Sequence, residues 1–532
     1  MRSRIAALAA LLLALVVPAA ALGHAERATF FPDHTLGALP KYRTSGPAKV
    51  VCKSDSAKRV RKLFSGSKER LRLKQLKSCR YRHIQAAVDA AVTGDRILIM
   101  PGVYREEPSR TIPLNDPKCA GAEFWESSGD NHQEDGRVPT FNHQAVCPNA
   151  RNLIAIIGDS LADDDRRCDQ KCNLLMHGMG RKPGDVVIEN DRIKQDAIRA
   201  DRADGFQIRN VLVEQAGYND INVVETNGFR LTHLIARWAK NYGILSFASD
   251  NGLYAHIDAY GNGDSGVYPG SGPEGHCKRY GIEVRHVDSH DNVIGQSGTA
   301  GNGTWIHHSK FHNNAAGISA DSFAPGHPGM PQDCSKWENN EVYSNNLNPF
   351  ADDNEKYCNA TPFEKRRKDV VCPQFLASVG TGFMLYGVND NLIQNNRIYD
   401  NWRSGMRLFW VPSALRGENS PASQTDTSNG NRTLTNSFGV GPDGKSMPNG
   451  ADVYWDEQGR ANCWNDNAVA PGKTLKSDPV ILPDCDDPLD SVLPVSRPDK
   501  TAGDAPCATW HPRDATDPPG CAWFTTPPKP QG

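Results

Sequence analysis

The pattern of apolar positions changes period within residues 81–104. Apolar residues first recur at i, i+3, i+4 and i+7, at Ile84, Ala87, Val88 and Ala91. This spacing is typical of one apolar stripe on a helix. Ile97–Met100 then forms a short, continuously apolar run that ends at Pro101-Gly102, as buried strands do. The pattern therefore predicts a short helix followed by a buried strand.

The chain then repeats two features with the period of one solenoid coil. Glycine and a following residue, mostly apolar, recur about one coil apart, at Gly205-Phe206, Gly228-Phe229, Gly252-Leu253, Gly281-Ile282 and Gly303-Thr304. Polar pairs spaced i, i+6 run in phase with them, at His256/Asn262, His286/Asn292, His308/Asn314, Asn340/Asn346 and Asn395/Asn401. Stacked coils place equivalent residues about 4.8 Å apart, so these pairs predict polar ladders.

A row of histidines in one column could also bind a metal. His233, His256, His286 and His308 fall near one column of the repeat. Asn210, Asn340 and Asn395 occupy that column too, and they need no ligand chemistry there. We therefore favour a structural ladder over a metal array.

The segments Ile-Gln-Ala-Ala-Val-Asp-Ala-Ala (84–91) and Pro-Gly-Val-Tyr (101–104) resemble the N-terminal cap of the pectin-lyase-like superfamily. A helix at this place makes physical sense, because the open end of a β-helix exposes apolar core and unpaired strand edges. The resemblance implies an all-β fold, a right-handed single-stranded parallel β-helix with a short N-terminal capping helix. It implies no particular activity.

We expect five regions along the chain. They are a signal peptide (1–25), a basic segment (26–80), the β-helix (81–410), a loop and hairpin extension (411–483) and a Pro-rich, disulfide-bearing, irregular tail (484–532). The hairpin is predicted within Ala451–Trp464, turning at Gln458-Gly459. Insertions at 324–336 and 349–374 should leave the coil as loops that flank a groove.

The first residues and the cysteines predict export. Arg2 and Arg4 precede the apolar run 5–17 and a small-residue stretch, which indicates a signal peptide too short to span a bilayer. The fourteen cysteines then indicate disulfides, with Cys52/Cys79, Cys119/Cys147 and Cys463/Cys485 as plausible partners. The close pair Cys168/Cys172 is a weak alternative zinc signature. We expect a secreted monomer without stable membrane insertion.

The overall charge narrows the possible partners. A formal net charge of −2 excludes a globally basic nucleic-acid binder. Residues 53–82 nevertheless carry a dense run of Lys and Arg. This run is either a solvated face or a contact with an anionic cell wall, and salt-sensitive release from cell walls would favour the second.

Alternation along the first strand of each coil predicts an exposed strip of polar and aromatic side chains. With Ile282 and Val284 facing inward, Glu283 and Arg285 face outward. The same phase gives the full strip as Arg209, Arg230, Tyr254, Glu283, Arg285, Trp305 and His307. An ordinary charged sheet face is the alternative interpretation.

The strip suits an acidic sugar polymer. Aromatic faces stack on sugar rings, and arginine binds carboxylates through paired hydrogen bonds. Cleavage of a polyuronide by β-elimination needs a base near C5 and a cation on the carboxylate. Arg285 and His307 could fill these roles, with Glu283 as the alternative base. We therefore predict Glu283, Arg285 and His307 as catalytic, and Arg209, Arg230, Tyr254 and Trp305 as substrate-binding.

A second exposed strip is predicted after the ladder asparagines. It contains Asp264, Tyr268, Gln296, Ser319, Asp321, Arg407 and Phe409. We assign Tyr268 to substrate binding. Asp264 and Asp321 are candidate calcium ligands, although one coil separates them.

Catalytic signatures of the superfamily are mostly missing. Trp305-Ile-His-His308 is similar to a pectate-lyase Trp-Ile-Asp-His with His in place of Asp. Asp288-Ser-His-Asp291 is similar to the Asp-Pro-His motif of alginate epimerases but lacks the Pro. The leading hypothesis is a secreted protein that binds or processes an extracellular acidic polysaccharide as a lyase, epimerase or hydrolase. The alternative is a non-catalytic surface or binding protein that uses the β-helix as a rigid scaffold.

Overall fold

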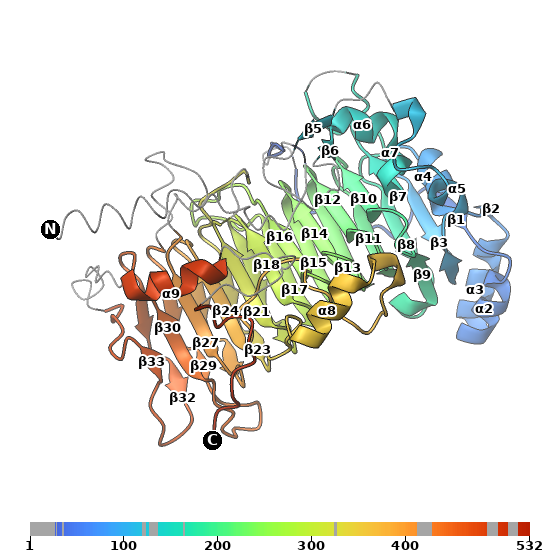
Figure 1. Cartoon of the computed structure of the whole chain (residues 1–532). Coiled ribbons are helices and arrows are strands. Elements are labelled where there is room, and N and C mark those ends of the chain that lie inside the picture. Colours follow the sequence, from blue (N-terminus) through green and yellow to red (C-terminus); the bar gives the residue numbers. More distant parts are fainter. Residues whose placement is uncertain are drawn as a thin grey trace.

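The computed structural model describes residues 27, 29–33, 37–119, 124–126, 137–162, 165–323, 327–411, 428–486, 498–508 and 520–531. The predicted signal peptide lies outside these residues. The chain is a right-handed parallel β-helix whose coils stack along one axis (Figure 1). Among the described residues, no helix is long and apolar enough to cross a membrane.

Two parallel sheets form the wall of the coil. Sheet 1 has twenty strands, β1 (Ala48–Val51), β2 (Cys79–Tyr81), β3 (Arg96–Ile99), β4 (Gly102–Tyr104), β8 (Leu175–Gly178), β9 (Val186–Glu189), β11 (Gln207–Glu214), β13 (Asn227–Arg237), β15 (Asp250–Tyr260), β17 (Ile282–His290), β19 (Thr304–His307), β20 (Lys310–His312), β22 (Lys336–Glu338), β23 (Glu341–Tyr343), β25 (Leu392–Gln394), β26 (Arg397–Tyr399), β28 (Arg432–Leu434), β29 (Ser437–Phe438), β31 (Cys463–Asn465) and β32 (Ala468–Val469). Sheet 2 has eleven, β7 (Asn152–Ile157), β10 (Asp196–Asp201), β12 (Asn219–Val224), β14 (Ile244–Phe247), β16 (Ser265–Gly270), β18 (Ile294–Thr299), β21 (Ala316–Asp321), β24 (Thr381–Tyr386), β27 (Ser404–Phe409), β30 (Ala451–Trp455) and β33 (Ser477–Asp478).

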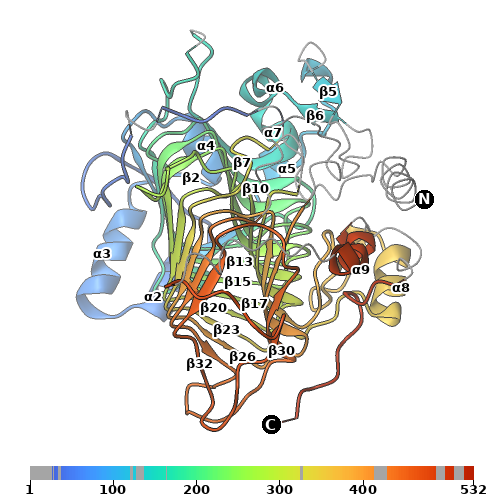
Figure 2. The same cartoon turned by 90° about the vertical axis from the view of Figure 1, so that its left-hand side faces the viewer.

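Short helices, 3-10 turns and one antiparallel strand pair accompany the two sheets. The helices are α2 (Ser56–Leu63), α3 (Gly66–Leu76), α4 (Ile84–Asp89), α5 (Glu107–Arg110), α6 (Phe141–Val146), α7 (Pro148–Arg151), α8 (Asp352–Ala360) and α9 (Pro498–Ala508), with 3-10 turns at Pro117–Cys119, Pro183–Asp185 and Phe363–Lys365. Strands β5 (Phe124–Glu126) and β6 (Arg137–Pro139) pair antiparallel. Figure 2 shows the coil from one end, with α2 and α3 on one side and α8 and α9 on another.

The predicted capping helix is confirmed as α4. Its residues Ile84, Ala87 and Val88 are fully buried and pack with Ile97 in the main core. The first backbone N–H groups of α4, from Ile84 and Gln85, each donate to the Glu106 carboxylate at 2.8 Å. The carboxylate thus satisfies donors that a helix leaves unpaired at its N-terminus.

A single residue in the left-handed conformation bends each coil within sheet 1. The bend occurs at Asn210, His233, His256, His286, His308, Asn339 and Asn395, with φ between 50° and 57°. Asn and His tolerate this conformation better than most residues, which explains why they alternate in the column. The rings of His256 and His286 stack at 4.9 Å. The sequence predicted Asn340 in this column, but the bend is at the preceding residue, Asn339.

Asn340 belongs to a different ladder, which faces the core. Its Oδ1 accepts from the Ser309 backbone N–H at 3.1 Å, and its own N–H donates to Asn396 Oδ1 at 3.0 Å. A second internal ladder runs through Asn262, Asn292, Asn314, Asn345, Asn401 and Asn449. It confirms the predicted ladder except at Asn346, which is again displaced by one residue.

The outer face carries a third ladder of stacked rings. Tyr260, His290, His312, Tyr343 and Tyr399 follow one another with ring centroids 4.7 to 5.2 Å apart. His290, the histidine of the epimerase-like motif, also contacts Asp258 at 3.1 Å and Asp291 at 2.6 Å. These partners raise the pKa of His290 to about 10, against the opposing effect of burial.

The coils extend past both ends of the predicted range. Strand β1 already pairs with β3, and β30 continues sheet 2 beyond Trp410. The segment Ala451–Trp464 is therefore not a β-hairpin, because β30 pairs with β27 in sheet 2 and β31 pairs with β28 in sheet 1. Because β30 and β31 belong to different sheets, they do not pair with each other.

Disulfides join all the cysteines. The three expected pairs, Cys52–Cys79, Cys119–Cys147 and Cys463–Cys485, are confirmed. Cys168 and Cys172 also form a disulfide, which leaves no thiolates there for zinc. The remaining pairs are Cys277–Cys334, Cys358–Cys372 and Cys507–Cys521.

We expect Asn314→Ala to lower the free energy of unfolding by about 2–3 kcal/mol, because it leaves buried backbone and amide groups without partners. Asn314 accepts from the Asn292 backbone N–H at 2.9 Å and donates to Ser289 O at 3.1 Å. Urea unfolding measures the change. His286→Asn is the control, and it should change stability by less than about 0.5 kcal/mol. Equal effects of the two substitutions would contradict the ladder account.

Candidate functional site

The middle coils of sheet 1 bring together a group of polar and aromatic side chains on their outer face. Parallel register aligns Glu283 with Trp305 and Lys336, and it aligns Arg285 with His307 and Glu338. We call these six residues the sheet 1 cluster. They occupy the outward positions of β17, β19 and β22, since Ile282, Val284, Ile306 and Trp337 are buried in the core. The prediction that Glu283, Arg285, Trp305 and His307 face outward is confirmed, but the prediction that His307 is exposed is wrong, because it is only 7% exposed.

Direct contacts hold the cluster in place. His307 Nε2 lies 3.2 Å from Glu283 Oε1, and Arg285 Nε lies 3.3 Å from the same oxygen. The Trp305 ring stacks on His307 with a centroid distance of 4.1 Å. The Trp305 indole N–H donates to Glu338 Oε1 at 2.7 Å. Each side chain therefore has its direction fixed by a neighbour on the same face.

The protonation states suit proton transfer at neutral pH. Burial lowers the pKa of His307 and outweighs the Glu283 hydrogen bond, which acts to raise it. The imidazole is therefore neutral at pH 7 and can accept a proton. Burial tends to raise the pKa of Glu338, but hydrogen bonds from Lys336, Gln394 and Trp305 hold this pKa below its ordinary value. Glu338 thus remains charged beside the aromatic ring.

Tyr254 is not part of this surface, which corrects the predicted strip. It is completely buried and aligns with the inward residues Leu231 and Val284. Gly252, taken as the equivalent of Gly228, actually pairs with Phe229, so the alignment was displaced by one residue. A Cβ on Gly252 would lie 2.1 Å from the Phe229 ring. The outward residues of this coil are Leu253 and Ala255 instead.

Arg209 and Arg230 face outward as predicted, but the N-terminal segment covers them. Arg230 Nε donates to Pro40 O at 3.0 Å, and the Arg209 guanidinium lies 4.7 Å from the Tyr42 ring centroid. Tyr42 OH also contacts His177 Nδ1 at 2.9 Å. These two arginines therefore border the sheet 1 cluster without being as open as Arg285.

Asp264, Tyr268 and Asp321 lie on the outer face of sheet 2, on the opposite wall from the cluster. The prediction that they are exposed is wrong, because each side chain is less than 5% exposed. Phe31 of the N-terminal segment packs against Tyr268 and its neighbours. Chain segments that are distant in sequence cover this face, and strand periodicity cannot reveal such a cover.

The covered face is rich in hydrogen-bonded carboxyl and hydroxyl groups. Ser265 Oγ donates to Asp264 Oδ1 at 2.7 Å, and Thr299 Oγ1 donates to Asp321 Oδ1 at 2.9 Å. Burial raises the pKa of Asp264 to about 7, and the Asp321 charge acts in the same direction. In the described part of the chain, no group of three or more His, Cys, Asp or Glu residues could hold a metal ion. Calcium binding by this pair stays a prediction.

Periodicity alone missed two members of the sheet 1 cluster, Lys336 and Glu338. Lys336 is the last residue of the insertion predicted at 324–336 and Glu338 follows it, so the repeat is interrupted and the register is lost in the sequence. Tyr280 was missed as well. It is 41% exposed and lies 6.0 Å from the Trp305 ring. Alternation around the buried Trp337 was the available signal for Lys336 and Glu338.

Comparisons with known proteins found similar solved structures. No family model matches the chain, and no curated protein sequence matches it. The A-module of the Azotobacter vinelandii mannuronan C-5 epimerase AlgE4 is 12% identical, covers 74% of this chain and 94% of its own, and has a TM-score of 0.39. The alginate lyase of Paenibacillus sp. str. FPU-7 is 11% identical, with 74% and 94% covered and a TM-score of 0.36. Pectate lyase Pel9A is 15% identical, with 84% and 80% covered and a TM-score of 0.28.

These neighbours are parallel β-helix proteins, and their names describe them as a polysaccharide epimerase and two polysaccharide lyases. Identities this low, with TM-scores below 0.5, say nothing about the substrate or the catalytic residues of this chain.

We expect Glu283→Gln to lower the pKa of His307 further, because the substitution removes a charge and a hydrogen bond that both act to raise it. NMR titration of the histidine ring signals measures the change. His290, whose contacts with Asp258 and Asp291 raise its pKa to about 10, should not change and serves as the internal control. A His307 pKa that stays the same or rises would contradict the described contact.

Proposed function

We propose that this protein is secreted and recognises an extracellular acidic polysaccharide through the sheet 1 cluster. One observation carries the proposal, the side-by-side placement of Arg285, Lys336, Trp305 and the His307–Glu283 pair. Arginine and lysine pair with sugar carboxylates, and the aromatic rings offer apolar faces to a pyranose. The seven disulfides support an oxidising, extracellular compartment.

The same residues support proton abstraction from a uronate. In β-elimination a base removes the proton at C5 while a cation neutralises the carboxylate. Neutral His307 is suited to accept that proton, and Glu283 stabilises the imidazolium that results. Arg285 is suited to bind the carboxylate of the uronate, because its side chain is 39% exposed. Its Nε lies 3.3 Å from Glu283 Oε1, which places the guanidinium next to the His307–Glu283 pair. The lyase and epimerase classes share this first step.

We expect Arg285→Ala to weaken polyuronide binding about 30- to 100-fold, which corresponds to a lost charge-assisted interaction of roughly 2–3 kcal/mol. Trp305→Ala should weaken it about 3- to 10-fold through lost ring stacking. Affinity electrophoresis against polygalacturonate and alginate measures both effects. Lys310→Ala, an exposed cation on the neighbouring strand β20, is the matched control and should bind normally.

Catalysis is tested with the same polymers by following unsaturated-product absorbance and reducing ends. We expect His307→Gln to abolish unsaturated product while polymer binding persists. Product that survives in His307→Gln would remove the histidine from the reaction. Binding without any product in the wild type would leave a non-catalytic binding protein on a rigid scaffold, and no binding to any polymer would defeat the proposal.

A further inference from the structure

Helices α2 and α3 cover the outer face of sheet 1 at the first coils (Figure 1). They lie between β1 and β2 in the chain, and the Cys52–Cys79 disulfide closes this helix hairpin at its base. Its apolar side, which includes Leu73, packs against Val50 and Leu98. These two residues face outward, because the residues that follow them in β1 and β3 are buried in the main core.

The helix hairpin lies over the same outward column that reaches the sheet 1 cluster. Strand register aligns Val50 with Leu98, His177 and Arg209 in turn. The column continues through β13 and β15 to Arg285, a member of the cluster. Six strand spacings separate β1 from β17, which amounts to about 29 Å. Both places therefore lie on one face of the coil, within reach of one extended polymer.

The exposed side of the helix hairpin is almost entirely positive. Residues 53–82 contain twelve Lys and Arg and two acids, Asp55 and Glu69. Among the described residues, only Lys53 and Arg59 of these cations have a carboxylate partner. Nine of the others are exposed, namely Lys58, Arg61, Lys62, Lys68, Arg70, Lys74, Lys77, Arg80 and Arg82.

This charge separation is larger than a cover for the sheet requires. Residues 53–82 have a formal charge of +10 in a chain of −2, which leaves −12 for all other residues. In addition, Lys58 and Lys62 lie one turn apart in α2, as do Arg70 and Lys74 in α3. Like charges at this spacing destabilise a helix, whereas a bound polyanion would remove the repulsion. A polyanion therefore accounts for a pattern that packing alone does not explain.

The stretch of sheet 1 between the helix hairpin and the cluster offers a further cation. Gln207 Nε2 donates to Lys41 O at 3.2 Å, and Arg230 Nε donates to Pro40 O at 3.0 Å. These bonds hold the N-terminal segment against the sheet, and the Lys41 side chain is exposed. Lys41 therefore lies on the way from the helix hairpin to the cluster.

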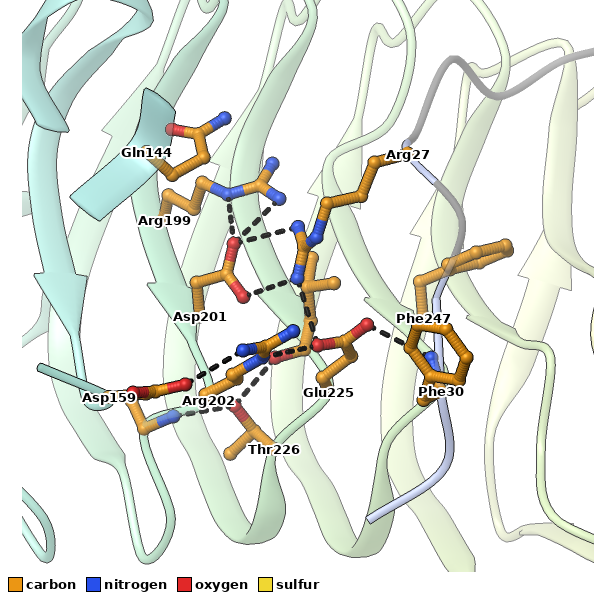
Figure 3. Close-up of polar contacts among 12 residues, drawn as sticks. Arg27, Phe30, Gln144, Asp159, Arg199, Asp201, Arg202, Glu225, Thr226 and Phe247 are labelled. Atoms are coloured by element: carbon orange, nitrogen blue, oxygen red, sulfur yellow. Dashed lines mark hydrogen bonds and ion pairs between the residues drawn. The ribbon is translucent and has the colours of Figure 1, made fainter. Parts of the chain in front are cut away.

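The segment that carries Lys41 is also fixed on sheet 2. Arg27 donates to both oxygens of Asp201 at 2.9 and 2.8 Å, and its Nη2 lies 3.0 Å from Glu225 Oε2 (Figure 3). The Phe30 backbone N–H donates to Glu225 Oε1 at 2.9 Å. The segment is thus held on both sheets, which keeps Lys41 in its place on the outer face of sheet 1.

The arginines along this face act on one another and on His177. Burial lowers the pKa of His177 to about 4, and the charges of Arg209 and Arg72 act in the same direction. Burial also lowers the pKa of Arg230, and the charge of Arg285 adds to this effect. Because Arg72 belongs to α3 and Arg285 to the cluster, positive potential extends along the face from one place to the other.

The helix hairpin lacks the features with which proteins bind single-stranded nucleic acids or membranes. Single-stranded nucleic acids stack on exposed aromatic rings, but Phe64 is half-buried, with the Arg72 guanidinium 5.7 Å from its ring centroid. An interfacial membrane helix buries an apolar face, but Leu71 is the one exposed large hydrophobic residue of α2 and α3. A linear polysaccharide with charged groups needs neither feature.

We infer that the helix hairpin is a second contact for the acidic polysaccharide, so that one long chain binds both there and at the sheet 1 cluster. The identity of the polymer rests on the proposed function, whereas the cationic surface does not. Two contacts on one chain raise the apparent affinity, because the second binding step becomes intramolecular. Oligomers too short to reach both places gain nothing from the helix hairpin.

The test compares trigalacturonate with an oligogalacturonate of about twenty residues, which reaches both places. The hairpin variant combines Lys68→Gln, Arg70→Gln, Lys74→Gln and Lys77→Gln. We expect it to bind the long oligomer at least about tenfold more weakly than the wild type at low salt, and to bind the trimer equally well. Calorimetry measures the affinities, and circular dichroism checks the fold.

The matched control combines Lys356→Gln, Lys365→Gln, Arg460→Gln and Lys473→Gln, four exposed cations outside the helix hairpin. It changes the net charge equally, so it should bind both oligomers like the wild type. A hairpin variant with wild-type affinity, or a control variant with the same loss, would overturn the inference. Trimer that binds no protein, with long oligomer still dependent on the helix hairpin, would defeat the sheet 1 proposal alone.

Labelling of the wild type is independent of how the variants fold. After amine acylation and mass spectrometry, Lys68, Lys74 and Lys77 should be protected by the long oligomer, while Lys356 and Lys365 react as before. Full reactivity of the three α3 lysines at saturating oligomer would refute the second contact. Stronger protection by a DNA duplex of equal charge than by the oligouronide would refute the polysaccharide as its ligand.

Discussion

The structure depends on parallel coils that stack in register, one strand spacing apart. Because equivalent residues face each other along the axis, every position of the coil becomes a column whose members must suit one another. Apolar columns such as Ile208–Leu231–Tyr254 build the core. The internal asparagine column satisfies backbone groups at the turns, with each Oδ1 accepting from the coil before it. Outward columns neither build the core nor satisfy the backbone at the turns. Their side chains can therefore bind or react with a ligand.

The two sheets use that freedom differently. On sheet 1 the outward side chains of Glu283 and Arg285 remain partly exposed, at 26% and 39%. On sheet 2 the outward columns are covered, and at the C-terminal end α9 contributes Asp504, which Arg407 contacts at 2.7 Å (Figure 1). Buried ion pairs contribute little net stability, because desolvation offsets the attraction.

Periodicity was sufficient for the class of fold and for the direction of most outward residues. The change from helical to strand spacing at 84–100 predicted α4 and β3, and alternation around Ile282 and Val284 correctly placed Glu283 and Arg285. It failed where a glycine stands one residue away from the position of the strand-opening glycine in the preceding coil. Gly252 imitates the strand-opening glycines but occupies a core position, so Tyr254 was turned to the wrong side.

Contacts between distant segments explain the remaining differences. Asp264 and Tyr268 were placed on the correct sheet face, but their burial depends on Phe31, which lies far away in sequence. Arg27 carries no periodic signal in the sequence. Its contacts with Asp201 and Glu225 depend on the path that the N-terminal segment takes across the coil. The insertion before Lys336 concealed two members of the sheet 1 cluster in the same way.

The most direct test is hydroxyl-radical footprinting of the wild-type protein with and without an oligouronide at saturating concentration. Binding at the sheet 1 cluster predicts severalfold lower oxidation of Trp305 and Tyr280, with unchanged oxidation of the partly exposed Tyr260 and Tyr343 on the outer ring ladder. Protection confined to Tyr260 and Tyr343, with Trp305 and Tyr280 as reactive as in the free protein, would contradict the account.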